Sequence, residues 1–334
     1  MRSARHWATA SNRSVMSVRH VILTALLVAL PLAPDELPRS SLRVRDGGVW
    51  RTWWRSEDAP ARWDDRPILA RHIAWQRVSD GVEWGELLIA GTGEAWRTRI
   101  VVARVDPAQV QIALDTAFSE GLRAAWRAER APGHALVAVN AGQFVETLPW
   151  GWVVLDGRQF LPPGVGPLSS AVTVDTSGKV RWIHGTAAVD SAARALRALV
   201  QDGAVDMRGM WAFQSYPTLL RDGEVPTALR SAAEGVDVAH RDARAAMGQL
   251  ADGRLLFVIT RFDGLRGVAG FVPFGLTTPE TAAVMGALGA RDAVMLDGGI
   301  SAQMLVRSDG GAVREWRGFR SVPLGLVVLP RSAQ

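Results

Sequence analysis

Short alternating runs of apolar and polar residues dominate the chain from Arg71 onward. Runs such as "EWGELLIAG", "RTRIVVARVD" and "VQIALDTA" are separated by Gly, Asp or Pro. This spacing predicts β-strands joined by tight turns. The runs "GWVVLDGRQF" and "SSAVTVDTSGKVRWIHG" contain Asp-Gly and Ser-Gly pairs, which are typical of hairpins.

Helical spacing is confined to a few stretches, namely 121–131, 189–205 and 277–290. In the last stretch we expect Thr278 as N-cap and Pro279 at the first helical position. Few helices, placed irregularly among many strands, predict an α+β fold with a strand-rich mixed or antiparallel sheet core. A doubly wound parallel sheet is disfavoured.

The N-terminus has the pattern of an export signal. Several arginines precede the uncharged apolar run "VILTALLVALPL", from Val21 to Leu32. The run is shorter than the roughly 20 residues of a spanning helix and has the length of a signal-peptide core. We therefore expect residues 1–33 to be a signal peptide or a retained signal anchor. The protein is expected to be exported to the periplasm or outside the cell, and an uncleaved segment would associate it with the membrane.

Residues 34–70 have a different composition from the remainder. They begin with the Pro/Ser-rich "PDELPRSS" and continue with four tryptophans mixed with charged residues. We interpret 34–70 as a linker or Trp-rich adapter and 71–334 as the catalytic domain. The tryptophans either pack on that domain or bind a glycan, and packing is the favoured interpretation.

Composition excludes several kinds of chemistry. Hydrophobic residues make up 48% of the 334 residues and charged residues 21%, so a large folded core is expected. Cysteine is absent, which excludes thiol catalysis, disulfides and cysteine-bound zinc. The net charge of +5 is carried by dispersed arginines without a nucleic-acid motif, so no nucleic-acid partner is expected. The six histidines show no ligand spacing, so we expect no metal and no cofactor.

Several turns each expose one polar group after an apolar run. Asn140 follows "VAV", Gln214 follows "WAF", Arg244 precedes "AAMG", and Asp297 follows "VML" and is itself followed by "GGIS". Glycine allows close approach of a ligand, arginine can hold a phosphate, and a half-buried carboxylate can act as acid, base or nucleophile. Together these groups predict a site for a phosphorylated substrate.

The same segments resemble the phosphodiester glycosidase family. The matching segments, in chain order, are "NAGQF" (140–144), "GWVVLDG" (151–157), "SYPTLLRDG" (215–223), "RAAMG" (244–248) and "LDGGIS" (296–301). The resemblance covers roughly residues 85–330. It implies a hydrolase that cleaves a sugar-1-phosphodiester, here a glycosyl phosphodiester in a cell-envelope or extracellular glycan.

The resemblance also implies roles for individual residues. Asp297, Arg244 and Glu146 are the expected catalytic residues. The expected substrate-binding residues are Asn140, Gly142, Gln143, Gln214, Gly298, Gly299, Ile300 and Ser301. Glycoside cleavage usually uses two carboxyl groups. Candidates for the second are Glu146, Asp156, Asp242 and Asp263, with Glu146 preferred.

The chain departs from the family pattern at Ala141, Gln143, Ala245 and Ile300. A β-branched residue resists positive φ, so Ile300 predicts a loop that is extended or shaped differently there. Two alternative functions stay open at this point. One is a non-catalytic glycan- or envelope-binding module on the same fold, and the other is a metal-dependent phosphodiesterase.

Overall fold

The computed structural model describes residues 37–116, 125–202, 206–231, 236–264 and 274–331. The chain divides into two units, and these residues belong to the second, Asp35–Gln334. The predicted signal segment, 1–33, lies outside the described residues. Within the described ranges, no helix is long and apolar enough to cross a lipid bilayer.

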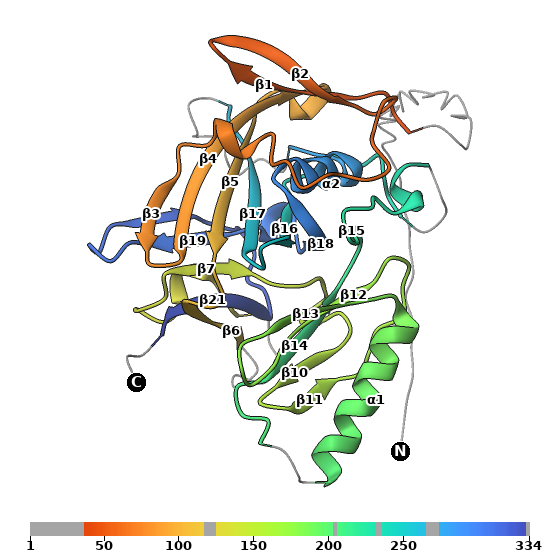
Figure 1. Ribbon diagram of the computed structural model, residues 1–334, viewed down its shortest axis with the longest axis vertical. Helices are drawn as coiled ribbons and strands as arrows, with labels where there is room; N and C mark the ends of the chain where they lie inside the picture. The colour runs from red at the N-terminus through yellow and green to blue at the C-terminus, as the bar shows by residue number, and fades with distance from the viewer. Residues whose placement is uncertain (1–36, 117–124, 203–205, 232–235, 265–273, 332–334) are drawn as a thin grey trace, which may run out of the picture. The chain divides into compact units, whose positions relative to one another are not determined.

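The largest sheet runs in the order β15-β18-β16-β17-β5-β4-β1-β2, and β3 pairs with β4 (Figure 1). Its strands are β1 (Ser41–Asp46), β2 (Val49–Arg55), β3 (Gln76–Ser79), β4 (Val82–Gly91), β5 (Thr98–Val105), β15 (Thr218–Leu220), β16 (Ala245–Leu250), β17 (Leu255–Phe262) and β18 (Ala290–Leu296). Every pairing in this sheet is antiparallel among the described strands.

Smaller antiparallel sheets complete the architecture. The second, in the order β11-β10-β14-β12-β13, contains β10 (Val153–Leu155), β11 (Arg158–Leu161), β12 (Ser170–Val174), β13 (Val180–His184) and β14 (Trp211–Ser215). The third, in the order β20-β19-β7-β21-β6, contains β6 (Val110–Thr116), β7 (Val137–Asn140), β19 (Met304–Arg307), β20 (Val313–Trp316) and β21 (Leu324–Pro330). A short hairpin is formed by β8 (Phe144–Val145) and β9 (Leu148–Pro149).

The helical elements are few in the part of the chain that the structure describes. They are the α-helices α1 (Thr186–Asp202) and α2 (Thr278–Ala287), and the 3₁₀ turns η1 (Ala70–His72), η2 (Gly93–Ala95), η4 (Ala128–Arg130), η5 (Thr227–Leu229) and η7 (Gly299–Ser301). Antiparallel sheets with two packed helices among the described residues confirm the predicted α+β class.

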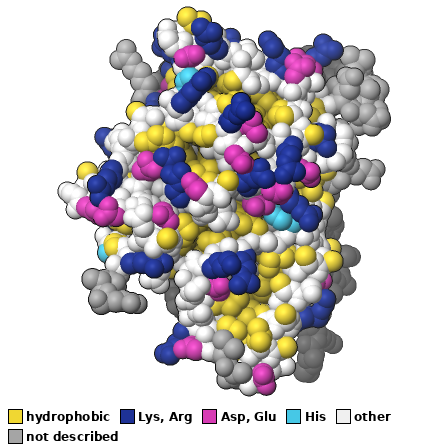
Figure 2. Space-filling view, viewed as in Figure 1, with side chains coloured by type: hydrophobic (Ala, Val, Ile, Leu, Met, Phe, Trp, Pro, Cys, Tyr) yellow, Lys and Arg dark blue, Asp and Glu magenta, His cyan; other side chains and the backbone are white. Residues whose placement is uncertain are grey.

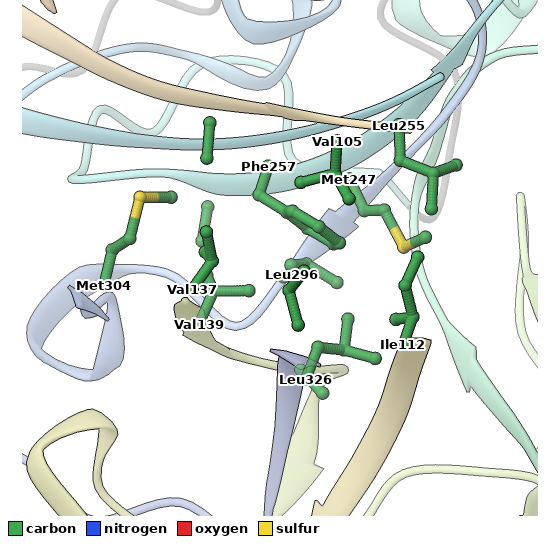
Figure 3. Close-up of a cluster of buried hydrophobic side chains, with 14 of the residues drawn as sticks. Val105, Ile112, Val137, Val139, Met247, Leu255, Phe257, Leu296, Met304 and Leu326 are labelled. Atoms are coloured by element: carbon green, nitrogen blue, oxygen red, sulfur yellow. The ribbon is translucent and has the colours of Figure 1, made fainter. Parts of the chain in front are cut away.

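The main core lies where the sheets meet. Figure 3 shows Met247 and Phe257 of the largest sheet facing Ile112 and Leu326 of the third. Side chains on the opposite face of the largest sheet pack against α2. Because both faces of this sheet are covered, its central strands are almost continuously apolar, as in β17. The core therefore fixes the strand ends that carry the site residues.

Helix α1 covers one face of the second sheet. Its buried residues Val189, Ala193 and Leu196 recur at helical spacing and pack against Trp152 and Ala171 of that sheet. The predicted helix at 189–205 is confirmed as far as it is described.

Helix α2 is buried along its whole length and begins with a capping box. The Thr277 hydroxyl accepts the Glu280 N–H at 3.3 Å, and the Glu280 carboxylate accepts the Thr277 N–H at 2.9 Å. The N-cap is therefore Thr277, and the expected cap at Thr278 was wrong by one residue. The hydroxyl one position earlier is the one that reaches the free N–H of the first turn.

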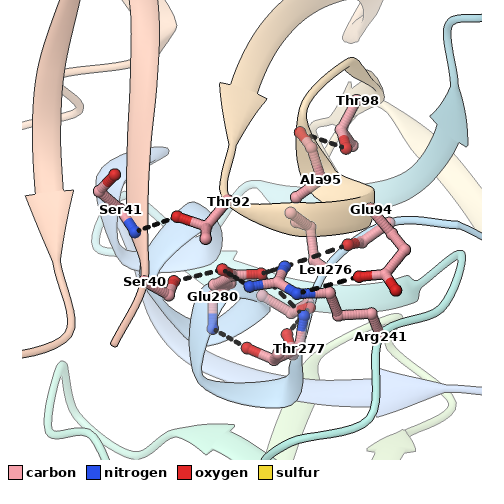
Figure 4. A network of polar contacts seen from close by, with 12 residues as sticks. Ser40, Ser41, Thr92, Glu94, Ala95, Thr98, Arg241, Leu276, Thr277 and Glu280 are labelled. Carbon is pink, nitrogen blue, oxygen red and sulfur yellow. Dashed lines mark hydrogen bonds and ion pairs between the residues drawn. The ribbon is translucent and has the colours of Figure 1, made fainter. Parts of the chain in front are cut away.

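Glu280 also anchors a buried polar network (Figure 4). Its side chain is fully buried, and its two oxygens accept bonds of 2.6 and 2.7 Å from the Arg241 guanidinium. The Ser40 hydroxyl donates to the same carboxylate, and Glu94 lies 3.6 Å from Arg241. The network ties α2 to the segment that precedes Asp242.

The helix predicted at 121–131 is wrong in its described part. Residues 125–131 contain only the turn η4, and Trp126 pairs with Val322 as an isolated antiparallel bridge. The Trp126 ring is buried beside Gly325, where a Cβ would approach within 2.0 Å. Tertiary packing of this one side chain overrides the helical spacing.

Residues 34–70 are integral to the fold where they are described. Strands β1 and β2 form a hairpin, and β1 pairs with β4 in the largest sheet. Trp54 and Trp63 are buried in the core cluster around α2. The predicted linker or adapter is therefore incorrect for this segment, whereas packing of these two tryptophans on the main domain is what the structure shows.

Gly286→Ala in α2 is expected to destabilise the fold by about 1–3 kcal/mol. A Cβ there would lie 2.3 Å from the Trp63 ring, and this overpacking outweighs the roughly 1 kcal/mol that alanine adds to a helix. Urea unfolding measures the difference. The matched control is Gly133→Ala, whose Cβ would meet nothing within 4 Å. Equal losses in the two variants would contradict the packing argument.

Candidate active site

Asp297 directly follows β18 and is held through its backbone by the end of β7. The Asn140 amide donates to the Asp297 carbonyl at 2.6 Å, and its oxygen accepts the Gln303 N–H at 2.9 Å. The Asp297 N–H donates to the Ala141 carbonyl at 3.2 Å. Asn140 is fully buried and its amide is engaged by the backbone, so it positions the loop rather than facing a substrate.

The glycines after Asp297 are required by close backbone approach. A Cβ on Gly298 would lie 2.6 Å from the Ala243 carbonyl, and one on Gly299 would lie 2.7 Å from the Asp242 carboxylate. The positive φ of the loop, +58°, falls on Gly299. Ile300 lies inside the turn η7, so the loop accommodates it by a 3₁₀ turn and not by extension.

The Asp297 carboxyl group is largely desolvated. Burial raises its pKa from 3.8 to about 6, although a hydrogen bond with Ser301 and the charge of Arg320 act in the opposite direction. The charge of Asp242 raises the pKa further. A carboxyl group with a pKa near 6 exchanges protons at near-neutral pH, as a catalytic acid or base must.

Asp242 is the second carboxyl group of the site. Burial raises its pKa, while the Ala243 N–H, Arg244 and His240 lower it. Its Oδ2 atom lies 3.8 Å from His240 Nε2. The same oxygen would be 2.7 Å from a Cβ at position 299, so it lies directly beside Gly299. The charge of Asp242 also acts on Asp297, where it adds to the effect of burial in raising the pKa. Asp242 was among the alternatives from sequence, behind Glu146.

Arg244 directly precedes β16, which pairs with β18, the strand that ends just before Asp297. Ala245 pairs with Leu296, and the Arg244 Cα is 3.6 Å from where a Gly298 Cβ would stand. Its guanidinium donates to the Leu276 carbonyl at 2.7 Å and also to the His240 carbonyl. Burial lowers its pKa. The cation whose charge acts on Asp297 is Arg320, whereas the charge of Arg244 acts on Asp242.

A pocket of about 170 Å³ opens beside Arg244. It is lined by Gln143, Tyr216, Pro217, Val236, Asp237, His240, Arg244, Thr278 and Met295. The Gln143 amide donates to the Leu296 carbonyl at 3.1 Å and to the Tyr216 carbonyl at 3.4 Å, so it connects this pocket to the Asp297 strand. Of the predicted residues, the structure brings Gln143 and Arg244 to this pocket, and Asp297, Gly298, Gly299, Ile300 and Ser301 to the adjoining loop.

Gln214 does not face the site. It is buried, its oxygen accepts the Trp152 and Gly164 N–H groups at 3.0 and 2.9 Å, and its nitrogen donates to the Gly164 carbonyl at 2.9 Å. The predicted substrate-binding role is therefore replaced by a structural one. Gly142 is likewise structural, because a Cβ there would lie 2.8 Å from the Gln214 carbonyl.

The other candidate carboxylates are engaged elsewhere. Glu146 is exposed at the turn of the β8–β9 hairpin with φ of +56°, and its carbonyl accepts a bond from Arg320. Asp156 caps the Gly209 N–H in another turn. Asp263 is buried between Arg97 and Arg99. Glu146 as second catalytic carboxylate stays a prediction, and Asp242 is the carboxylate whose charge acts on Asp297.

Sequence reasoning missed Arg320, His240 and Tyr216. Arg320 lies over the Phe144 ring at 4.6 Å, and Tyr216 contacts Trp150 edge-on at 4.5 Å. Tyr216 is inside a recognised motif, and its position beside Pro217 was the available signal. His240 precedes the Arg244 motif by four residues, whereas nothing local marks Arg320.

Metal binding has no side-chain cluster in the described ranges. No group of three or more histidine, aspartate or glutamate side chains there is arranged to hold a metal ion.

The comparisons with known proteins agree with this fold. The Phosphodiester glycosidase family model matches residues 133–329, and no curated protein matches the chain. The catalytic domain of zebrafish N-acetylglucosamine-1-phosphodiester alpha-N-acetylglucosaminidase, auto-inhibited by its pro-peptide, is similar with a TM-score of 0.55 and 16% identity, over 81% of this chain and 95% of that one. A hypothetical protein from Synechocystis has a TM-score of 0.48 and 15% identity, over 90% and 69%. At 16% identity the zebrafish structure shows the fold alone. The family model covers more than half of the chain, which therefore belongs to the phosphodiester glycosidase family.

Proposed function

We propose that this protein hydrolyses a glycosyl phosphodiester, adding water across the bond between the anomeric carbon and the phosphate oxygen. The observation that carries the proposal is the buried Asp297 carboxyl group at the end of β18, whose pKa is raised and on which the charge of Asp242 acts. Two carboxyl groups within electrostatic reach of each other can divide the acid and base roles of glycoside cleavage.

Asp297 is the residue to which we assign proton transfer. Its pKa of about 6 leaves both protonation states populated near neutral pH. Ser301 orients the carboxyl group by a hydrogen bond, and Asn140 fixes the backbone behind it. The group therefore needs little rearrangement before it meets a substrate.

Two arginines supply positive charge for the phosphate. Arg320 acts on the Asp297 carboxyl group, and Arg244 lines the pocket. Guanidinium groups bind phosphate oxygens through paired charge-assisted hydrogen bonds. We assign the sugar to the pocket, where Gln143 and Tyr216 supply polar and aromatic surface.

Hydrolysis of an aryl glycosyl phosphate in ¹⁸O-labelled water tests the proposal. Cleavage at the anomeric carbon places the label in the sugar, whereas label in the phosphate would identify a phosphodiesterase. Loss of all turnover with EDTA would favour metal-dependent chemistry. Saturable binding of the compound without any turnover would favour the non-catalytic module.

Asp242→Asn is expected to move the pH dependence of kcat/KM. The charge of Asp242 raises the pKa of Asp297. Removing that charge lowers this pKa below about 6, so the limb of the pH–rate profile that reports Asp297 moves to lower pH. A pH–rate profile of the variant measures this shift. Asp252→Asn, which removes a carboxylate paired with Arg254, is the matched control and should leave the limb in place. If this limb stays at the wild-type pH in both variants, Asp242 has no electrostatic effect on Asp297.

We also propose that the enzyme acts outside the cytoplasm, on glycans of the cell envelope or of the extracellular space. The support is the sequence of residues 1–33, with arginines followed by an uncharged apolar run. Cell fractionation, with N-terminal sequencing of the recovered protein, tests export and cleavage together.

A further inference from the structure

A larger cavity lies on the other side of the segment that borders the candidate site. Its volume is about 430 Å³, within the range of small-molecule sites. It is lined by Ala61, Arg62, Leu168, Ser169, His184, Gly185, Thr218, Arg221, Glu224, Val225, Pro226, Thr227 and Arg230. Tyr216 and Pro217 line the site pocket and Thr218 lines this cavity, so a single short segment borders both. The two share no lining residue.

The arginines of this cavity differ in their partners. Arg62 is neutralised by Asp222 at 2.8 Å and Glu224 at 3.4 Å. Arg221 and Arg230 form no ion pair with any described carboxylate. Over much of the face in Figure 2, by contrast, basic side chains lie close to acidic ones. The cavity therefore carries two guanidinium charges that the described protein does not neutralise.

Arg230 is also held in place. Its Nε donates to the Val225 carbonyl at 3.2 Å and its Nη2 to the Thr227 hydroxyl at 3.4 Å. The remaining N–H groups of the guanidinium have no partner in the described residues. A cation that is fixed by uncharged acceptors and keeps free donors is suited to an anionic ligand.

His184 is fixed in the wall of this cavity by a chain of hydrogen bonds. The Thr218 hydroxyl donates to the Leu168 carbonyl at 2.7 Å, so the Ser170 hydroxyl must donate its own proton to Thr218. His184 Nδ1 is hydrogen-bonded to the Ser170 hydroxyl at 2.8 Å and Nε2 to Asp292 at 2.9 Å, so the ring is held in place from both sides.

We propose that this cavity is a second binding site, for a phosphate-bearing molecule about the size of a hexose phosphate. Arg221 and Arg230 bind the phosphate through charge-assisted hydrogen bonds. The apolar surface of Leu168, Val225 and Pro226 covers a sugar face. The proposal does not depend on the proposed hydrolysis, because the site shares no residue with Asp297 or its pocket.

Calorimetric titration with glucose 6-phosphate tests the site, because this phosphate is not on the anomeric carbon and is not a glycosyl phosphodiester. We expect saturable one-to-one binding by the full chain. The double variant Arg221→Gln/Arg230→Gln should weaken the affinity at least tenfold. The matched control Arg55→Gln/Arg314→Gln removes the same charge from two exposed arginines outside the cavity and should leave the affinity unchanged.

Further variants and titrations show which of the two pockets binds glucose 6-phosphate. Arg244→Gln removes the cation of the site pocket and should leave glucose 6-phosphate binding intact. Inorganic phosphate and glucose, titrated separately, show which half of the ligand supplies the affinity. Circular dichroism and thermal melting confirm that each variant is folded. The proposal is overturned by the absence of saturable binding, by equal losses in the cavity variant and its control, or by a loss that occurs only in Arg244→Gln.

Discussion

Asp297→Asn is expected to reduce kcat/KM by about 10³-fold, within the range of positioned acid–base groups. The same substitution is expected to raise the free energy of unfolding above pH 6. Both results follow from one property, the burial of a carboxyl group at the end of β18. Burial tunes the pKa of the group for proton transfer and disfavours its ionised form in the folded state.

The pH dependence of this stability difference has a definite sign. The pKa of Asp297 is about 6 in the folded protein and 3.8 in the absence of burial, so the folded state holds the proton more tightly. This contribution is fully present below pH 4 and is lost as the pH rises through 6. Each pKa difference of one corresponds to about 1.4 kcal/mol, so ionised Asp297 destabilises the fold by at most about 3 kcal/mol.

Thermal melts of wild type and Asp297→Asn between pH 4 and pH 8 measure the effect. The melting temperatures of the two proteins should be equal near pH 4 and should differ increasingly as the pH rises, with the variant melting at the higher temperature. Asp309→Asn changes an exposed carboxylate and should affect neither rate nor stability. A stability difference that does not change with pH would contradict the assignment of a raised pKa to Asp297.

Glu280→Ala is expected to cost about 3–5 kcal/mol of unfolding free energy, the usual effect of breaking a buried ion pair. The substitution leaves the Arg241 guanidinium, whose side chain is 13% exposed, without its main counter-charge. It also removes the carboxylate that caps Thr277 at the start of α2. Urea unfolding measures the loss.

Two further variants test whether the loss comes from breaking the buried Glu280–Arg241 ion pair. Glu224→Ala also removes a glutamate from an arginine pair, but that carboxylate is 65% exposed, so the cost should stay below about 1 kcal/mol. In the double variant Glu280→Ala/Arg241→Ala, part of the stability should return, because no unpaired cation remains buried. A double variant whose loss equals the sum of the single losses would show that the two side chains are not coupled.

The fold class and the principal loop could be predicted because their signals are local. Alternation marks strands, and Asp297 with its glycines forms one continuous motif whose geometry depends on few distant atoms. Helix α2 has its own capping box. The helical stretch at 121–131 failed because burial of Trp126 against Gly325 is a contact across about two hundred residues of chain.

The partners of Asp297 could not be predicted for the same reason. Asp242 and Arg320 act on it through space, and neither is close to it in sequence. Gln214 shows the opposite error, since a polar residue at a strand end was interpreted as exposed when its amide binds buried backbone groups. A motif identifies the residue types of a site, but antiparallel pairing decides which of them meet.

Ile300 has a consequence for how this family could diversify. Its carbonyl accepts the N–H groups of Phe319 and Arg320, at 2.7 and 3.1 Å, while its side chain is 48% exposed. The turn thus uses only main-chain atoms at this position, and the positive φ that the turn requires falls on Gly299. Position 300 is a place where mutation can sample new side chains beside the Asp297 carboxyl group without disturbing the loop, and directed evolution of substrate preference would start there.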